Sequence, residues 1–207
     1  MYGLPSSTER HKRIAKSEFI KRFDISGKQR NTFDRDVSRI EIVGAISPRT
    51  MPALREGIKV KSLYVMEITL KRKEYDKRSI VLLAEKTPQN LLLVLLHEGE
   101  ASIAVYYGGK LFSSGWQNAG DIRIIIDAND LDVVWQHIVA QAGNISVEEG
   151  NTLDTQISLD TRKALLGKKI EQLRRKSLKE QQPRKKADMH NEMLRLKEEL
   201  KGLESRR

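Results

Sequence analysis

The clearest pattern in the chain is a series of strand-like segments. Residues 37–43 alternate apolar and polar positions, as a half-buried strand does. Residues 58–70 begin in the same way and become almost continuously apolar, and residues 91–96 are apolar throughout, which is typical of a central strand covered on both faces. These segments, together with residues 102–107, 110–116 and 123–126, predict a sheet of about six strands that are mostly antiparallel.

A basic stretch before the first strand has the spacing of an amphipathic helix. Ser6, Ser7 and Thr8 can cap its free backbone amides, so we expect one helix to run from this trio to Phe23. Its apolar stripe would consist of Ile14, Phe19, Ile20 and Phe23. The next segment, residues 27–36, is polar and leads into the first strand.

Two further helices are expected among the strands. Residues 75–85 form the first, which ends at Thr87-Pro88 because proline disfavours helix in the residue before it. Asp130 caps the second, which covers residues 131–142 and ends at Gly143. The first 143 residues are therefore predicted to be an α+β domain with helices packed on one side of the sheet.

The composition changes after a connector over residues 144–157. Residues 158–207 are rich in Leu, Lys, Arg, Glu and Gln, which favour helix. Apolar positions recur here at alternating intervals of four and three residues, the seam of a coiled coil. The seam residues are Leu166, Ile170, Leu173, Met189, Met193, Leu196, Leu200 and Leu203.

The two halves of this seam match when the chain folds back near Pro183. Leu166 then faces Leu200, and Ile170 faces Leu196, as in a symmetric antiparallel hairpin. Pro183 suits the first turn of the second helix, where its missing N–H costs little. The alternative is one long helix, kinked at Pro183, that forms a parallel homodimer.

Positive charge is concentrated in this C-terminal segment. The whole chain carries a formal charge of +10, and residues 161–207 hold 16 Lys and Arg against 7 Asp and Glu. We expect the basic residues near the bend to form an exposed tip that contacts nucleic-acid phosphates or an acidic protein surface. They are Arg174, Arg175, Lys176, Lys179, Arg184, Lys185 and Lys186. A secondary basic region contains Lys12, Arg13, Lys16, Lys21 and Arg22.

No catalytic signature accompanies this charge. The chain has no cysteine, which excludes thiolate chemistry, and His11, His97, His137 and His190 are not spaced as metal ligands. No metal and no cofactor are therefore expected. Glu67 lies on a predicted strand, but the Glu-x-Lys pattern of many nucleases is missing because residue 69 is threonine. A metal-dependent nuclease would need a dispersed carboxylate site around Glu67 and Glu98.

Other features bear on location and on base stacking. The N-terminus lacks the apolar run of a signal peptide, and no apolar segment is long enough to cross a membrane, so a cytoplasmic protein is expected. Aromatic residues fall on predicted strands, where they can stack on single-stranded bases or simply pack in the core. They are Tyr64, Tyr106, Tyr107 and Trp116.

Several stretches, taken in order, resemble a bacterial family known as domain of unknown function 4391 (DUF4391). They are Gly3-Leu-Pro-Ser-Ser-Thr8, residues 37–42 with Ser47-Pro-Arg-Thr50, residues 90–96 leading to Trp116, Gly150-Asn-Thr-Leu-Asp154 and Gln182-Pro-Arg-Lys-Lys186. The resemblance covers nearly the whole chain. Ala15 stands where proline is the usual form in that family.

The resemblance implies a role in DNA-acting defence, because members of this family tend to be encoded beside helicases and DNA methyltransferases of restriction-like, phage-defence clusters. It supplies no catalytic residue. We therefore expect a non-enzymatic accessory subunit whose partner is a helicase or DNA methyltransferase, with DNA as a further partner at the basic tip. The alternatives are an autonomous nucleic-acid-binding protein and the nuclease considered above.

Overall fold

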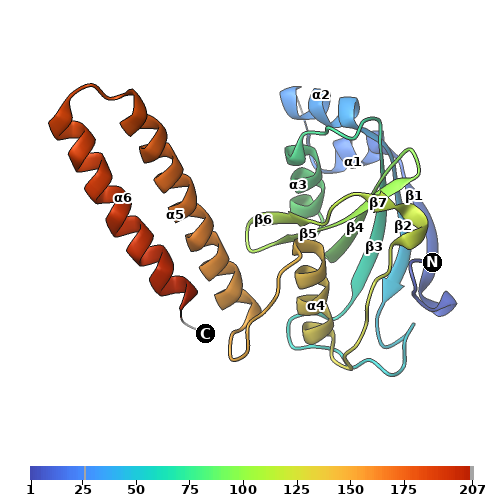
Figure 1. Ribbon diagram of the computed structural model, residues 1–207. Coiled ribbons are helices and arrows are strands. Elements are labelled where there is room, and N and C mark those ends of the chain that lie inside the picture. The colour runs from blue at the N-terminus through green and yellow to red at the C-terminus, as the bar shows by residue number, and fades with distance from the viewer. Residues whose placement is uncertain (26, 206–207) are drawn as a thin grey trace. The chain divides into compact units, whose positions relative to one another are not determined.

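The computed structural model describes residues 1–25 and 27–205, which fall into two compact units. The first unit, Met1–Ile145, contains a sheet and four α-helices, and the second begins at Ser146 and contains a pair of helices (Figure 1). Residues 206 and 207, the end of the expected hairpin, lie outside the described residues.

Seven strands form one mixed sheet within the described part of the first unit. Six of them lie in the order β1-β2-β3-β4-β5-β6, and β7 pairs with β5. All neighbours are antiparallel except β3 and β4, which are parallel and are joined through α3. The strands are β1 (Glu9–Ile14), β2 (Val37–Ile46), β3 (Leu63–Leu70), β4 (Asn90–His97), β5 (Glu100–Tyr107), β6 (Lys110–Ser113) and β7 (Gln117–Asn118). The predicted α+β class with a mostly antiparallel sheet is confirmed.

Three helices cover one face of the sheet. They are α1 (Lys16–Arg22), α2 (Gly27–Asp36) and α3 (Lys77–Lys86), and their buried side chains form one cluster with alternate residues of the central strands. Leu91, Leu93 and Leu95 contribute from β4. Phe19 of α1 stacks on Phe33 of α2 with ring centroids 5.6 Å apart.

The fourth helix packs against the opposite face, which differs from the one-sided arrangement expected from the sequence. α4 (Leu131–Gly143) contacts β5 and β6, and at its end Gly143 lies against Phe112 of β6. Leu111, the preceding residue, packs with the cluster of α1–α3, and successive strand residues point to opposite faces. Because β4 is apolar at every position from 91 to 95, both faces of the sheet need a helical layer.

The N-terminal helix predicted from Ser6 to Phe23 is wrong in its first half. Ser6–Thr8 is a short 3-10 helix, and the basic stretch that follows is the edge strand β1, in which Lys12 faces Ile42 and Ile14 faces Ile40 of β2. Only the second half of the expected helix forms, as α1. Residues 27–36, which were expected only to be polar, form α2.

Two predicted strand segments are not strands. Residues 58–62 precede β3, and the N–H groups of Ile58, Lys59 and Val60 donate to the Asp132 carboxylate instead of to a neighbouring strand. Residues 123–126 also lack strand pairing, since Gln141 of α4 donates to the Arg123 carbonyl. Polar side chains of α4 thus take all three of these hydrogen bonds in the first segment and two in the second, where the Ile124 N–H donates to the Tyr2 carbonyl.

The second unit is a hairpin of α5 (Leu153–Lys179) and α6 (Pro183–Glu204), which contact each other along their length (Figure 1). α5 starts within the stretch 144–157 that was expected to be a connector, and Thr152 caps it by accepting a hydrogen bond from the Thr155 N–H. Pro183 is the first residue of α6, as predicted. All eight seam residues are buried or half-buried, and Leu166 and Leu196 are the most buried of them.

The positions of two ion pairs between the helices agree with the coiled-coil seam. Arg162 pairs with Glu199, and Lys169 pairs with Glu192 at 3.3 Å. Each of these four residues immediately precedes a seam position of the heptad pattern, the place where charged residues meet across an antiparallel coiled coil. The pairs lie at the surface and contribute little to stability, so the apolar seam provides most of the hairpin's stability.

Asp36 connects α2 to the segment between β3 and α3 through a carboxylate that is 0% exposed. It lies at the end of α2 and accepts hydrogen bonds from the Arg72 side chain at 2.8 Å and from the Asp76 N–H at 2.9 Å. Burial opposes ionisation, but these bonds and one from Arg35 outweigh it and hold the pKa of Asp36 below its ordinary value of 3.8. The carboxylate thus joins α2 to the segment between β3 and α3.

Replacement of Asp36 by asparagine should destabilise the first unit by about 2 kcal/mol, because the amide cannot accept the same set of hydrogen bonds. The loss of stability is limited because the side chains of Arg35 and Arg72 are half-exposed, so water can replace the hydrogen bonds that they lose. Because the pKa of Asp36 is lower in the folded than in the unfolded state, the ionised carboxylate stabilises the folded protein above pH 3.8. This stabilisation is lost as the pH falls through the folded-state pKa. Urea unfolding across pH 3–7 should therefore show the difference from wild type shrinking at acidic pH. Asp34→Asn is the control, because Asp34 lies on the same helix with a side chain that is 42% exposed and pairs with Lys16 and Arg30 near the surface. It should change stability by less than about 1 kcal/mol.

Replacement of Leu196 by alanine should loosen the hairpin. The side chain is 7% exposed, and its truncation is expected to cost about 2–3 kcal/mol. Hydrogen exchange measured over α5 and α6 should become faster throughout the pair. Leu178→Ala is the matched control, because Leu178 is 74% exposed and its truncation should change exchange very little. Equal effects from the two variants would mean that the seam does not hold the hairpin together.

Candidate anion-binding sites

The seven basic residues predicted at the tip are all exposed, and they flank the turn between α5 and α6. Glu180 forms this turn by accepting a hydrogen bond from the Gln182 N–H at 2.9 Å. Within the described part of the chain, only two of the seven form ion pairs: Arg174 and Arg175 both pair with Glu171, at 3.8 and 3.0 Å. The other five are available to an external anion. They are Lys176, Lys179, Arg184, Lys185 and Lys186.

The secondary basic region is divided between two elements. Lys12 and Arg13 lie on β1, and Lys16, Lys21 and Arg22 lie on α1. Lys16 is engaged, since its ammonium group lies 3.2 Å from Asp34 and donates to the Val37 carbonyl. The remaining members therefore do not form one helix face, and only some of them come together at a pocket.

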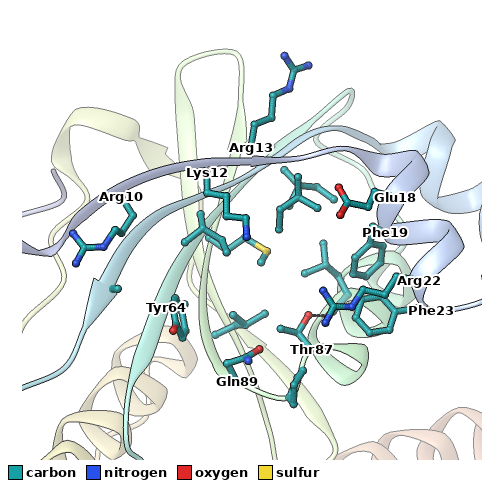
Figure 2. Close-up of a pocket in the computed structure, with 18 of the residues that line it drawn as sticks. Arg10, Lys12, Arg13, Glu18, Phe19, Arg22, Phe23, Tyr64, Thr87 and Gln89 are labelled. Carbon is teal, nitrogen blue, oxygen red and sulfur yellow. Dashed lines mark hydrogen bonds between the residues drawn. The ribbon is translucent and has the colours of Figure 1, made fainter. Parts of the chain in front are cut away.

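This pocket, which we call the sheet pocket, has a volume of about 530 Å³ and lies over the sheet between α1 and α3 (Figure 2). Its apolar floor comes from β2, β3 and β4, and includes Ile40, Ile42, Met66 and Leu91. Phe19 and Phe23 of α1 line one side, and the end of α3 with Thr87, Pro88 and Gln89 lines another. The edge strand β1 forms a third side.

Positive charge surrounds the sheet pocket. Five basic side chains and one acidic side chain, Glu18, are among its lining residues. The basic residues are Arg10, Lys12, Arg13, Arg22 and Arg49. None of the five forms an ion pair with another described residue, although Arg10 donates to the Ser7 and Glu9 carbonyls and Arg22 lies 5.7 Å from the centre of the Phe23 ring. A group of cations without counter-ions raises the local positive potential.

The basic side chains do not all point the same way. Figure 2 shows Lys12 reaching into the sheet pocket from β1, while Arg22 approaches from α1 on the other side. Arg13 points away, as the alternation of side chains along a strand requires. Lys12 and Arg22 are therefore the two cations best placed to share one anionic group.

The carboxylates considered for a nuclease are not brought together. Glu67 faces Val94 across the β3–β4 pair, whereas Glu98 lies in the turn beyond the end of β4, about 13 Å along the strand from that position. Glu67 instead lies opposite Glu41 of the neighbouring strand β2 and accepts a hydrogen bond from the Tyr2 hydroxyl. The sequence analysis did not single out Glu41 or Tyr2; the signal for Glu41 was an isolated acidic residue between two isoleucines.

The histidines remain scattered. His11 lies 3.8 Å from Glu41, His97 lies 3.9 Å from Glu98, and His137 contacts Asp127 at 2.5 Å. His190 is an exposed residue of α6. No group of three or more potential metal ligands occurs among residues 1–25 and 27–205.

The remaining aromatic residues have different environments. Tyr64 is half-buried and lines the sheet pocket, and Trp116 packs against the core cluster. The Tyr106 hydroxyl donates to Glu85. None of the described helices is long and apolar enough to cross a membrane.

The sheet pocket itself was not expected from the sequence. Arg10 and Arg49 were not assigned to any site, because Arg10 was placed on a helix and Arg49 in a turn after the first strand. The available signal was an excess of basic residues before residue 30, but the pairing of β1 with β2 decides which of them meet.

Comparison with known proteins identifies one family. No curated protein and no solved structure matches the chain. The family model described as Domain of unknown function (DUF4391) matches residues 2–200, which include both units apart from the last residues. The chain is therefore a member of the DUF4391 family.

Proposed function

We propose that this protein is a non-enzymatic accessory subunit of a bacterial DNA-processing complex, and that its hairpin tip binds DNA phosphates. A larger protein, of the helicase or DNA methyltransferase type, would be its principal partner. The observation that carries this proposal is the group of five exposed basic residues at the turn between α5 and α6, which form no ion pair with any residue that the structure describes.

The form of the tip supports phosphate binding. Lys and Arg side chains on a helical turn can follow a phosphate backbone without reading its bases. Acidic residues are few near the turn, and Glu171 already pairs with two arginines. Residues 161–207 carry a formal charge of +9, whereas residues 1–160 carry +1. The attraction to a polyanion is therefore concentrated on this part of the hairpin.

The proposal of a protein partner rests on the family and on the hairpin's surface. The family resemblance implies genes for helicases and methyltransferases nearby. Leu165, Leu178 and Leu194 are exposed on the hairpin outside its seam. A protein partner that binds the hairpin would cover this apolar surface.

Reversal of the tip charges should weaken DNA binding and its dependence on salt. Each neutralised phosphate contributes about −0.9 to the slope of log K against log salt concentration. The variant Arg184→Glu, Lys185→Glu, Lys186→Glu should therefore reduce the slope by up to about 2.7. Fluorescence anisotropy with duplex DNA between about 50 and 200 mM salt measures this slope.

A matched control separates the tip from the total charge. Lys168, Lys197 and Lys201 lie on the same two helices, are exposed and form no ion pair with another described residue. Their triple replacement by glutamate changes the net charge by the same amount and should leave most of the slope intact. If both triple variants lose the slope equally, the hairpin binds DNA through overall charge and the tip is not a site.

The protein partner should remain bound when nucleic acid is removed. Tagged full-length protein would be isolated from the lysate of its own host, and half of the sample treated with nuclease before washing. Mass spectrometry should find a helicase or methyltransferase in both halves. If every protein leaves with the nucleic acid, the chain is an autonomous nucleic-acid-binding protein and the accessory role is rejected.

A further inference from the structure

We propose that the sheet pocket binds a nucleotide, with the phosphate held between Lys12 and Arg22 and the base placed over the apolar floor beside Tyr64. This inference concerns residues of the first unit only, so it does not depend on the hairpin tip. The carrying observation is that a pocket of nucleotide size combines unpaired cations at its mouth with apolar and aromatic walls.

The dimensions of the sheet pocket fit a small ligand. Its volume of about 530 Å³ lies within the range of roughly 300–1,000 Å³ that is common for sites of small molecules and cofactors. Such sites combine apolar walls with a few polar groups that fix the ligand's orientation. Ile40, Met66 and Leu91 at the floor and the polar groups at the rim give this pocket both features.

The mouth of the pocket is suited to a phosphate. Lys12 and Arg22 approach from opposite sides (Figure 2), and neither forms an ion pair with another described residue. An arginine offers a planar pair of donors to phosphate oxygens, and a lysine adds a compact charge. Arg10 and Arg49 at the rim add to the positive potential, which exceeds the opposing effect of Glu18.

The interior is suited to a base. Tyr64 is half-buried beside the floor, so one part of its ring is available for stacking, whereas the Phe23 ring already has Arg22 over it. The Tyr64 hydroxyl and the Gln89 amide form no hydrogen bond with another described residue. These groups can both donate and accept, as recognition of the edge of a base requires.

Two simpler ligands fit the lining less well. Inorganic phosphate would satisfy the cations but make no contact with the apolar floor. A fatty acid would cover the floor, but its chain would meet the Gln89 amide without offering it a hydrogen bond. A nucleotide uses both parts of the sheet pocket.

Isothermal titration calorimetry on the full-length protein tests this inference. The probes are the four nucleoside 5′-monophosphates, adenosine and inorganic phosphate. At least one monophosphate should bind roughly tenfold more tightly than adenosine or inorganic phosphate, because only it makes both the charge-assisted bonds and the apolar contact. Binding of no monophosphate, or equal binding of inorganic phosphate, would overturn the proposal.

Variants locate the site. Arg22→Glu should weaken binding by roughly tenfold or more, whereas Lys21→Glu makes the same charge change one residue away, outside the pocket lining, and should leave affinity nearly unchanged. Tyr64→Leu should weaken the monophosphate while leaving any weak binding of inorganic phosphate unaltered. Equal losses from Arg22→Glu and Lys21→Glu would reject the sheet pocket as the site. Thermal unfolding establishes that each variant is folded, and Lys12→Glu on the exposed edge strand replaces Arg22→Glu if the latter is not.

The nucleotide can be free or can be the end of a strand, and the same assay distinguishes the two. A short single strand with a 5′-phosphate would be compared with the same strand carrying a 5′-hydroxyl and with the free monophosphate. Tighter binding of the phosphorylated strand, lost in Arg22→Glu, identifies a strand end as the ligand. Equal binding of the free monophosphate identifies a mononucleotide. Strand binding that is lost only in the hairpin-tip triple variant belongs to the tip and overturns the assignment to the sheet pocket.

Discussion

The parallel pairing of β3 with β4 is the interaction on which the rest of the first unit depends. Leu92, Leu93, Val94 and Leu95 are fully buried, so this pair requires cover on both faces. A parallel pair also requires a crossover, which α3 supplies. Asp36 ties the start of this crossover to α2, and α4 covers the other face. The sheet pocket lies between α1 and α3, over the floor that this pair and β2 provide.

The central elements could be predicted from the sequence because their apolar patterns are strong. Residues 91–96 have no polar interruption, and the hairpin seam repeats over several turns of both helices. The edge strand β1 could not be recognised, since four of its six residues are exposed and its basic side chains have no apolar alternation. Its sequence suits a basic helix equally well, and only the pairing of Lys12 and Ile14 with β2 decides the matter. The helix α2 was missed for a similar reason, because Phe33 is its only large apolar residue and the only one that anchors it in the core.

The two candidate sites also differ in how far they could be predicted from the sequence. The hairpin tip is continuous in sequence apart from the turn, so its charge was visible directly. The sheet pocket combines segments near residues 10, 22, 49, 64 and 89, and no local pattern relates them. The secondary basic region before residue 30 was also misleading when it was taken as one site, because Lys16 pairs with Asp34 and Arg13 points away from the pocket. Sheet register selects Lys12, and the packing of α1 on the sheet through Phe19 selects Arg22. Both are long-range properties of the fold.

The two basic surfaces should also select different partners for physical reasons. At the tip, exposed side chains on a convex turn remain hydrated, so their attraction to phosphates is mainly a counter-ion effect that carries no information about the attached base. In the sheet pocket the cations border an apolar floor, where an anion must bring an apolar group of matching size to gain more than a surface ion pair provides. A ligand with charge alone therefore favours the tip, and a ligand with charge and a flat ring favours the pocket. On these proposals, the same excess of positive charge would give binding without sequence preference at one surface and recognition of a single chemical unit at the other.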